Sequence, residues 1–264
     1  MNWTRAALKG AAKQDMKQSM KHYVGVTVLV FFLSLATVIP AIIFAVVELW
    51  ALYVLALLAA IFLIDIPLSV GMAACHVRAP QGERNISNLF MVFRSGKYWS
   101  VVGAMLRCSV VIFLWSLLFL IPGIIKSYQY AMVPFILCES PGVSGKEAMQ
   151  ISRQMTNGQK GGMFVLDLSF IGWELLALIP IWIFMGIATF MSVSGGGSVG
   201  AIIFLAIVLY LVSIAALLLI AIYHNATYTQ LYFTMRDTFF KQRQTESPQQ
   251  PNTGLDPRYQ PPAQ

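Results

Sequence analysis

Long apolar runs with almost no charged residues are the feature that most restricts how this chain can fold. A helical crossing of a hydrocarbon core needs roughly 20 apolar residues, and a water-facing fold cannot accommodate several such runs. Charged residues make up 11% of the chain and hydrophobic residues 58%, whereas a typical soluble domain has about 25% charged residues. The sequence therefore predicts an all-α polytopic membrane protein, with apolar runs at 23–47, 49–77, 98–121, 122–137, 162–191 and 201–223.

The placement of Lys and Arg predicts six transmembrane helices. The run 122–137 is at the short limit for a crossing. If it crosses, every Lys and Arg except Arg107 and Lys126 lies on one side of the membrane. Because cytoplasmic loops are enriched in Lys and Arg, we predict a multi-pass protein of the cell (cytoplasmic) membrane with both termini in the cytoplasm. The net charge of +7 then reflects topology, and we expect no nucleic-acid partner.

The chain is predicted to have three regions. Residues 1–22 form a cytoplasmic basic amphipathic helix, residues 23–240 the six-helix membrane domain, and residues 241–264 a disordered Gln/Pro-rich tail in the cytoplasm. Within residues 1–22 a base recurs every four residues. Such a stripe fits a helix lying on anionic lipid, where each base contributes roughly 1 kcal/mol; a merely solvated helix is the alternative. The members of this lipid-surface basic stripe are Arg5, Lys9, Lys13, Lys17 and Lys21.

Further amphipathic helices are predicted on the cytoplasmic side. One lies near residues 86–93, and another continues the last span over residues 228–239. A third begins at Ser144, where Ser144-x-x-Glu147 has the spacing of a capping box, and it ends near Asn157-Gly158. Between the third and fourth spans, Pro122-Gly123 is expected to break the helix, either as a tight turn or as a bend that lines a cavity.

Five ionisable residues within the predicted spans are the candidate site residues. A charge at the bilayer centre costs about 2.5–3.5 kcal/mol on insertion scales. Matched depth and opposite sign suggest an inner cluster and an outer pair. The inner cluster contains Asp65, Arg107 and Asp167, and the outer pair contains Lys126 and Glu174. These charges could instead be static contacts between helices, they could line a polar path, or Lys126 could extend its ammonium group to the membrane surface.

Motifs typical of zinc proteases or of nucleotide-driven pumps are not found in the sequence. The histidines His22, His76 and His224 lie far apart at predicted inner span ends, and no HExxH or P-loop pattern occurs. The three cysteines have no metal-ligand spacing. We therefore predict no catalytic residues, no metal site and no cofactor, and we expect that the protein is not an enzyme.

Four segments resemble one known family. They are LIPGIIKSYQYAMVPFILCE, SGKEAMQISRQM, FVLDLSFIGWELL and YHNATYTQLYFTM, in this order, and the N-terminal RAALKGAAK also fits. Together they resemble the uncharacterised bacterial multi-pass family known as domain of unknown function nine-seven-five, over about residues 3–240. The resemblance implies an integral membrane protein and assigns no catalytic residues.

The leading interpretation is a non-enzymatic accessory or organising component of the bacterial cytoplasmic membrane. Its partners would be a bilayer with anionic lipids and a membrane protein, and the sequence does not define an oligomeric state. The alternative is a small transporter or lipid-handling protein that uses the intramembrane charges as a path. A membrane enzyme is a third, weaker interpretation, since no nucleophile with a neighbouring base is found.

Overall fold

The computed structural model is mostly helical, and the described residues include no strand. It describes residues 3–46, 49–140, 142–194 and 199–246. Six helical stretches are long and apolar enough to cross a membrane, which confirms the predicted all-α, six-span class. They are Arg5–Pro40, Trp50–Gln81, Tyr98–Leu118, Leu120–Glu139, Lys160–Met191 and Ile202–Gln242.

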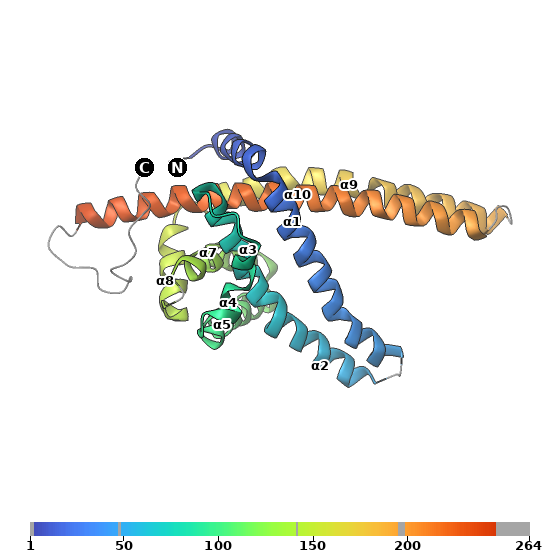
Figure 1. The fold of residues 1–264 in the computed structure, drawn as a ribbon, viewed down its shortest axis with the longest axis horizontal. Helices are drawn as coiled ribbons and strands as arrows, with labels where there is room; N and C mark the ends of the chain where they lie inside the picture. Colours follow the sequence, from blue (N-terminus) through green and yellow to red (C-terminus); the bar gives the residue numbers. More distant parts are fainter. Residues whose placement is uncertain (1–2, 47–48, 141, 195–198, 247–264) are drawn as a thin grey trace.

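The six stretches form three helical hairpins. The first pairs α1 (Arg5–Val46) with α2 (Trp50–Ala60), which continues through a π-helical turn, η1 (Ile61–Asp65), into α3 (Ile66–Arg78). The second pairs α5 (Tyr98–Leu118) with α6 (Leu120–Tyr130), and α7 (Val133–Glu139) follows. The third pairs α9 (Lys160–Ser194) with α10 (Val199–Glu246). Figure 1 shows the first and third hairpins diverging from a shared region where α1 and α10 meet.

Short elements connect the hairpins at this shared region. Residues after α3 form two 3₁₀ turns, η2 (Ala79–Gln81) and η3 (Ile86–Phe90), and the short helix α4 (Met91–Arg94). The helix α8 (Gly145–Met155) precedes α9 and packs on α5, α6, α7 and α10. We call this shared region the base. Large buried side chains gather there, including Val70, Met132, Leu166 and Leu231.

The outer segments of the hairpins expose most of their apolar side chains. We call these segments the arms (residues 32–46, 49–64, 106–121, 171–194 and 199–219). Leu117, Trp182 and Phe204 are each at least 70% exposed. In the last span, only 6% of the most apolar stretch of 18 residues is buried within the chain. Such apolar faces require contact with hydrocarbon or with another membrane helix.

The turn of the second hairpin differs from the sequence prediction. The helix break falls at Phe119, which is extended, and Pro122-Gly123 lies inside the first turn of α6, where proline costs least. A Cβ atom on Gly123 would come within 2.0 Å of Ser116 Oγ, so glycine permits the close approach of α5 and α6. The returning stretch, Leu120–Glu139, is 20 residues long and therefore exceeds the run predicted from the sequence.

A proline also explains a contact between the first two hairpins. Pro67 follows the π turn and has no N–H, so it cannot donate to the carbonyl of Leu63 one turn earlier. The phenol of Tyr98 donates to that carbonyl oxygen instead, at 2.6 Å. The start of α5 is thereby attached to the bend in the second span.

The predicted N-cap at Ser144 is confirmed, as one of the two hydrogen bonds of a capping box. Ser144 is the N-cap of α8, and its hydroxyl accepts a hydrogen bond from the backbone N–H of Glu147 at 3.3 Å. At the other end Gly158 has a φ of +72°, the left-handed conformation that glycine adopts readily. The apolar face of α8 is buried through Ala148, Ile151 and Met155.

The apolar faces of the predicted cytoplasmic helices pack mostly on the protein itself. Leu8 and Ala12 on α1 are buried, and so are Leu231 and Met235 on α10. In the segment 86–93, Leu89 and Val92 are buried, whereas Ile86 and Phe93 of the predicted face are exposed. These faces therefore contribute to the base.

Two boundaries fall differently from the predicted regions. Residues 5–22 are continuous with the first span as one helix, α1, and α10 continues to Glu246, beyond the predicted start of the tail at 241. The remainder of that tail, 247–264, lies outside the described residues.

Candidate functional site

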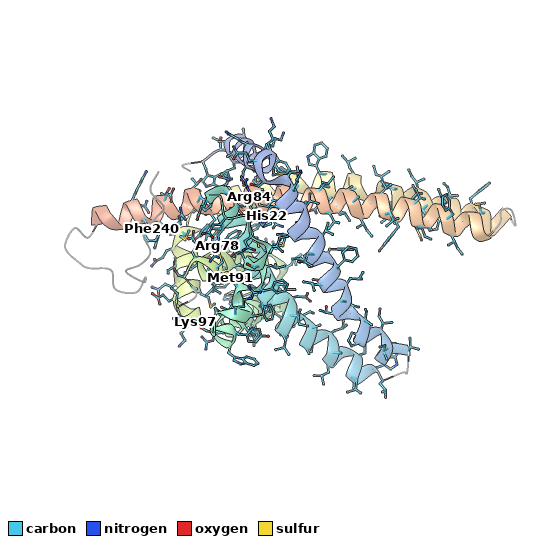
Figure 2. All side chains as sticks on the ribbon, viewed as in Figure 1. His22, Arg78, Arg84, Met91, Lys97 and Phe240 are labelled. Atoms are coloured by element: carbon cyan, nitrogen blue, oxygen red, sulfur yellow. The ribbon has the colours of Figure 1, made fainter. Side chains whose placement is uncertain are left out.

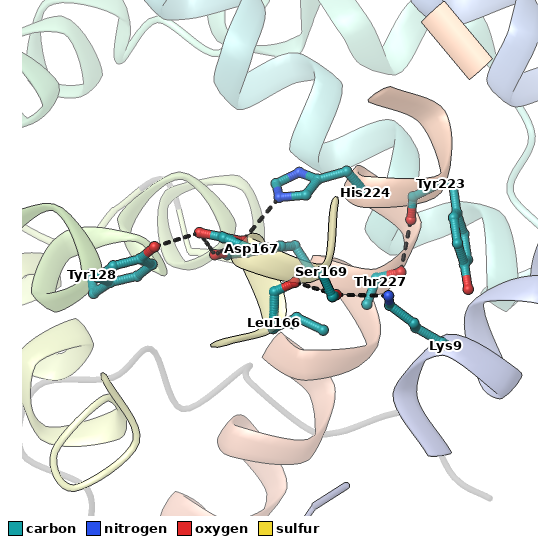
Figure 3. A network of polar contacts seen from close by, with 9 residues as sticks. Lys9, Tyr128, Leu166, Asp167, Ser169, Tyr223, His224 and Thr227 are labelled. Atoms are coloured by element: carbon teal, nitrogen blue, oxygen red, sulfur yellow. Dashed lines mark hydrogen bonds and ion pairs between the residues drawn. The ribbon is translucent and has the colours of Figure 1, made fainter. Parts of the chain in front are cut away.

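The carboxylate of Asp167 is the centre of the most connected polar cluster that crosses the base. Tyr128 Oη donates to Oδ2 at 2.7 Å, and Tyr228 Oη lies 2.8 Å from both carboxylate oxygens. His224 Nε2 lies 3.1 Å from Oδ1, which is a hydrogen bond when that nitrogen bears the proton. Figure 3 shows Tyr128 and His224 approaching Asp167 from different sides. We call these four residues the Asp167 cluster.

Three helices supply the Asp167 cluster. Tyr128 lies in the last turn of α6, Asp167 lies two turns into α9, and α10 provides the other two. His224 and Tyr228 are four residues apart, so they share one face of α10, and their ring centroids are 4.6 Å apart. The cluster thus joins the second hairpin to the third.

Lys9, a member of the basic stripe, connects the first hairpin to α9 close to the Asp167 cluster. Lys9 Nζ donates to Ser169 Oγ at 2.7 Å and lies 4.4 Å from the centre of the Phe170 ring (Figure 3). The same ring meets His224 edge-on, with centroids 5.0 Å apart. Because α1 is fixed to α9 by this contact, Lys9 acts within the protein and does not face lipid freely.

A second polar cluster lies further along α10. Arg236 Nη1 is 2.7 Å from Glu139 Oε1, and Tyr232 Oη donates to the other carboxylate oxygen of Glu139 at 2.5 Å. The Arg236 side chain is only 9% exposed and that of Glu139 13%. This buried ion pair attaches the end of α7 to α10.

The hydrogen bonds and the ion pair of the two clusters indicate that these side chains hold helices together. Both oxygens of Asp167 already accept hydrogen bonds, so the carboxylate has little capacity to act as a base. No group of three or more His, Cys, Asp or Glu side chains that could hold a metal ion occurs among the described residues. The cysteines Cys75, Cys108 and Cys138 are buried free thiols.

The predicted ion pairs between the five intramembrane charges do not form among the described residues. Asp167 belongs to the cluster above, and Asp65 accepts from Ser34 Oγ at 2.8 Å. Lys126 donates to Gln129 Oε1 at 3.3 Å and lies 5.0 Å from the centre of the Trp115 ring. These three charges are therefore satisfied locally, by neutral side chains or by the Asp167 cluster.

Arg107 and Glu174 differ from the other three. Both side chains are exposed, one on α5 and the other on α9. Neither has a hydrogen bond or an ion pair with any residue in the described part of the chain. Each is flanked by exposed apolar side chains, Leu106 for Arg107, and Trp173 and Leu175 for Glu174.

The rest of the basic stripe remains on the surface. The side chains of Arg5, Lys13, Lys17 and Lys21 are exposed along α1. Lys13 Nζ also lies 5.9 Å from the centre of the Tyr223 ring. Since the apolar side of this helix packs on the base, the stripe presents charge outward but little apolar surface.

Several residues of the two clusters were not predicted. Sequence reasoning placed Tyr228 and Tyr232 on an apolar face, His224 at a span end, and Glu139 and Arg236 in cytoplasmic segments. The spacing of His224 and Tyr228 was the available signal, since two polar rings four residues apart indicate a shared partner on another helix.

The fold and the clusters define a class: a multi-pass helical protein whose helices are tied together at one end by polar side chains. Residues 117–238 match the family model described as "Protein of unknown function (DUF975)". This is the family that the sequence segments resemble, so the resemblance is confirmed over that range. No curated protein matches the chain, and no solved structure matches it.

Proposed function

We propose that this protein is a non-enzymatic accessory or organising component of the bacterial cytoplasmic membrane, and that its arms bind the membrane helices of a partner protein. The observation on which the proposal rests is the pair of exposed charges, Arg107 and Glu174, on arms whose other described residues carry no charge. The base holds the hairpins together, and the arms are left to make contacts outside the chain.

Placing the charges of Arg107 and Glu174 within a bilayer costs free energy. A charge near the bilayer centre costs about 2.5–3.5 kcal/mol on insertion scales, and such residues usually face other protein. Arg107 could reduce the cost by extending toward the membrane surface, whereas the shorter Glu174 has less reach. A partner helix that offers an opposite charge or a hydrogen-bond donor would remove the cost.

A transport path receives less support from the geometry. Asp65, Lys126 and Asp167 are satisfied by separate partners, and Arg107 and Glu174 lie on different hairpins. A path would need several of these side chains to face one continuous cavity. Catalysis is supported even less, because both oxygens of the Asp167 carboxylate already accept hydrogen bonds that hold helices together.

The orientation is also part of the proposal. With six crossings, the bases at the start of α1, in α8 and at the end of α10 fall on one side, which the charge rule assigns to the cytoplasm. A reporter that fluoresces only in the cytoplasm should be active when fused to either terminus. Activity of an exported-enzyme reporter at either terminus would contradict this orientation.

The functional test is purification of tagged protein from its native membranes in mild detergent, followed by mass spectrometry of the retained proteins. We expect a partner in stoichiometric amount with the wild type and a large loss of it with Glu174→Gln. The matched control is Lys17→Gln, which removes an exposed charge from the base and should retain the partner. A wild-type protein that purifies alone, or with only a bound solute, would refute the proposal.

A further inference from the structure

A polar groove lies on the base between the end of α6, the outward side of α8 and the start of α9. Its volume is about 630 Å³, within the range of sites for small ligands. Three of its lining residues are cationic, namely Lys146, Arg153 and Lys160, and none of the described residues that line it is acidic. The groove therefore presents a concentrated positive charge.

The sequence of α8 explains why these groups face the groove. Lys146, Gln150 and Arg153 follow one another on α8 at intervals of four and three residues, so they share one side of the helix. Asn157 lies in the turn that follows α8 and also lines the groove. The opposite side contains the buried Ala148 and Ile151. Packing of α8 on the base thus turns its cationic and amide side chains outward, into the groove.

A buried amide lies on the inner side of the groove. Gln129 lines it and is only 3% exposed. The Gln129 backbone carbonyl, near the end of α6, accepts from Ser152 Oγ at 2.8 Å and from Thr156 Oγ1 at 3.4 Å. With Lys126 bound to its side-chain oxygen, the position of this residue is fixed.

The remaining donor of that amide has no partner. Gln129 Nε2 is buried and makes no hydrogen bond within the described part of the chain. An unsatisfied buried donor costs about 1–3 kcal/mol, so such groups usually serve a ligand or an ordered water. Gln129 and the three cationic residues line the same groove, and an oxygen of an anion bound there would satisfy this donor.

From this arrangement we propose that the groove is a binding site for a phosphate-bearing anion. Lys146, Arg153 and Lys160 supply the charge, and Gln129 Nε2 donates to an oxygen of the ligand at depth. Arginine pairs with phosphate through two parallel hydrogen bonds, and lysine adds a point charge. The anion can be the head group of an anionic phospholipid or a free phosphate compound, because both offer the same oxygens.

The location of the groove bears on the lipid source. Lys160 is the first residue of α9, which begins the fifth span. A head group at the end of a span would lie at the level of this residue, and basic pockets at such ends bind anionic head groups. The proposal does not depend on the protein partner suggested above.

The test uses the full-length protein in a neutral detergent with two probes. Inorganic phosphate is titrated calorimetrically. Short-chain phosphatidylglycerol and phosphatidylcholine are compared by native mass spectrometry of the lipid retained. The main variant is Lys146→Gln with Arg153→Gln, whose side chains are exposed. The matched control is Arg94→Gln with Lys97→Gln, which removes one exposed arginine and one exposed lysine from the segment at the end of α4, outside the groove.

We expect at least one probe to bind and the main variant to weaken it by about tenfold or more, because two charge-assisted contacts are lost. Gln129→Glu should weaken it similarly, since a carboxylate replaces the donor. Binding of phosphate alone identifies a free solute, and selective retention of phosphatidylglycerol without phosphate binding identifies a lipid. The proposal is overturned if neither probe binds, or if the control weakens binding as much as the main variant.

Discussion

Replacing Asp167 with alanine should destabilise the protein more than removal of any other intramembrane carboxylate. The substitution removes an acceptor that serves Tyr128, Tyr228 and His224, and it leaves two phenol donors without their partner. Hydrogen bonds to a charged group contribute about 1.5–3 kcal/mol each, and they are not additive within one cluster. With the carboxylate side chain 25% exposed, we expect a loss of about 3 kcal/mol in total.

Thermal unfolding in detergent can measure this loss with a thiol-reactive fluorescent dye. The chain's three cysteines are buried and unpaired, so they react only when the base opens. By the scaling for soluble chains of comparable size, about 3 kcal/mol corresponds to a shift of roughly 6–12 °C. Asp167→Asn retains one acceptor and should shift less, whereas Glu174→Gln should shift little, since Glu174 has no partner in the described residues.

A double-mutant cycle makes the prediction specific to the cluster. Tyr228→Phe should be destabilising in the wild type and nearly silent in Asp167→Ala, because the phenol has then already lost its acceptor. Full additivity of the two substitutions, or an Asp167→Ala protein as stable as Glu174→Gln, would refute the reasoning.

Two further stability predictions use the same assay. Gly123→Ala should cost about 1–3 kcal/mol, because its Cβ would lie 2.0 Å from Ser116 Oγ; Gly103→Ala, which meets nothing within 4 Å, is the control, and an equal effect of both would contradict the close packing of α5 on α6. Arg236→Met should cost about 3–5 kcal/mol, since it removes one partner of a buried ion pair. Adding Glu139→Gln to that variant should recover some of the loss, and no recovery would argue against the ion pair.

Hydropathy and charge placement predicted most of the fold. The six spans follow from run length, because hydrocarbon forces every backbone polar group into a helix. The cap at Ser144 follows from a local hydrogen bond, which a four-residue pattern is sufficient to specify. Both are properties of single segments, so no knowledge of neighbouring helices was required.

The candidate site was less predictable because it depends on how helices meet. Pairing by depth assumed that opposite charges attract across upright, parallel helices. In the structure Asp167 is satisfied largely by neutral phenols, and Arg107 and Glu174 lie on different hairpins, on α5 and α9. Tyrosine and glutamine have no charge to mark them as partners, and hydropathy treats tyrosine as an interface anchor.

The helices expected to lie on the lipid surface pack on the protein instead. Leu8 on α1 and Leu231 on α10 are buried in the base, so these helices have little apolar surface left for lipid. Charged side chains stay exposed on the surface of the base. Arg84 and Lys97, both labelled in Figure 2, are examples. An amphipathic pattern indicates that one face is covered, and only the tertiary structure shows by what.

The most direct test of the proposed function is photo-cross-linking from the arms in native membranes. A photoreactive amino acid is placed at Trp182 on α9 or at Phe204 on α10, both highly exposed, and at Lys21 on the base as a control. We predict that at least one arm position gives a discrete protein adduct, that Glu174→Gln abolishes it, and that the control position does not produce it. Adducts with lipid alone at both arm positions would contradict the account.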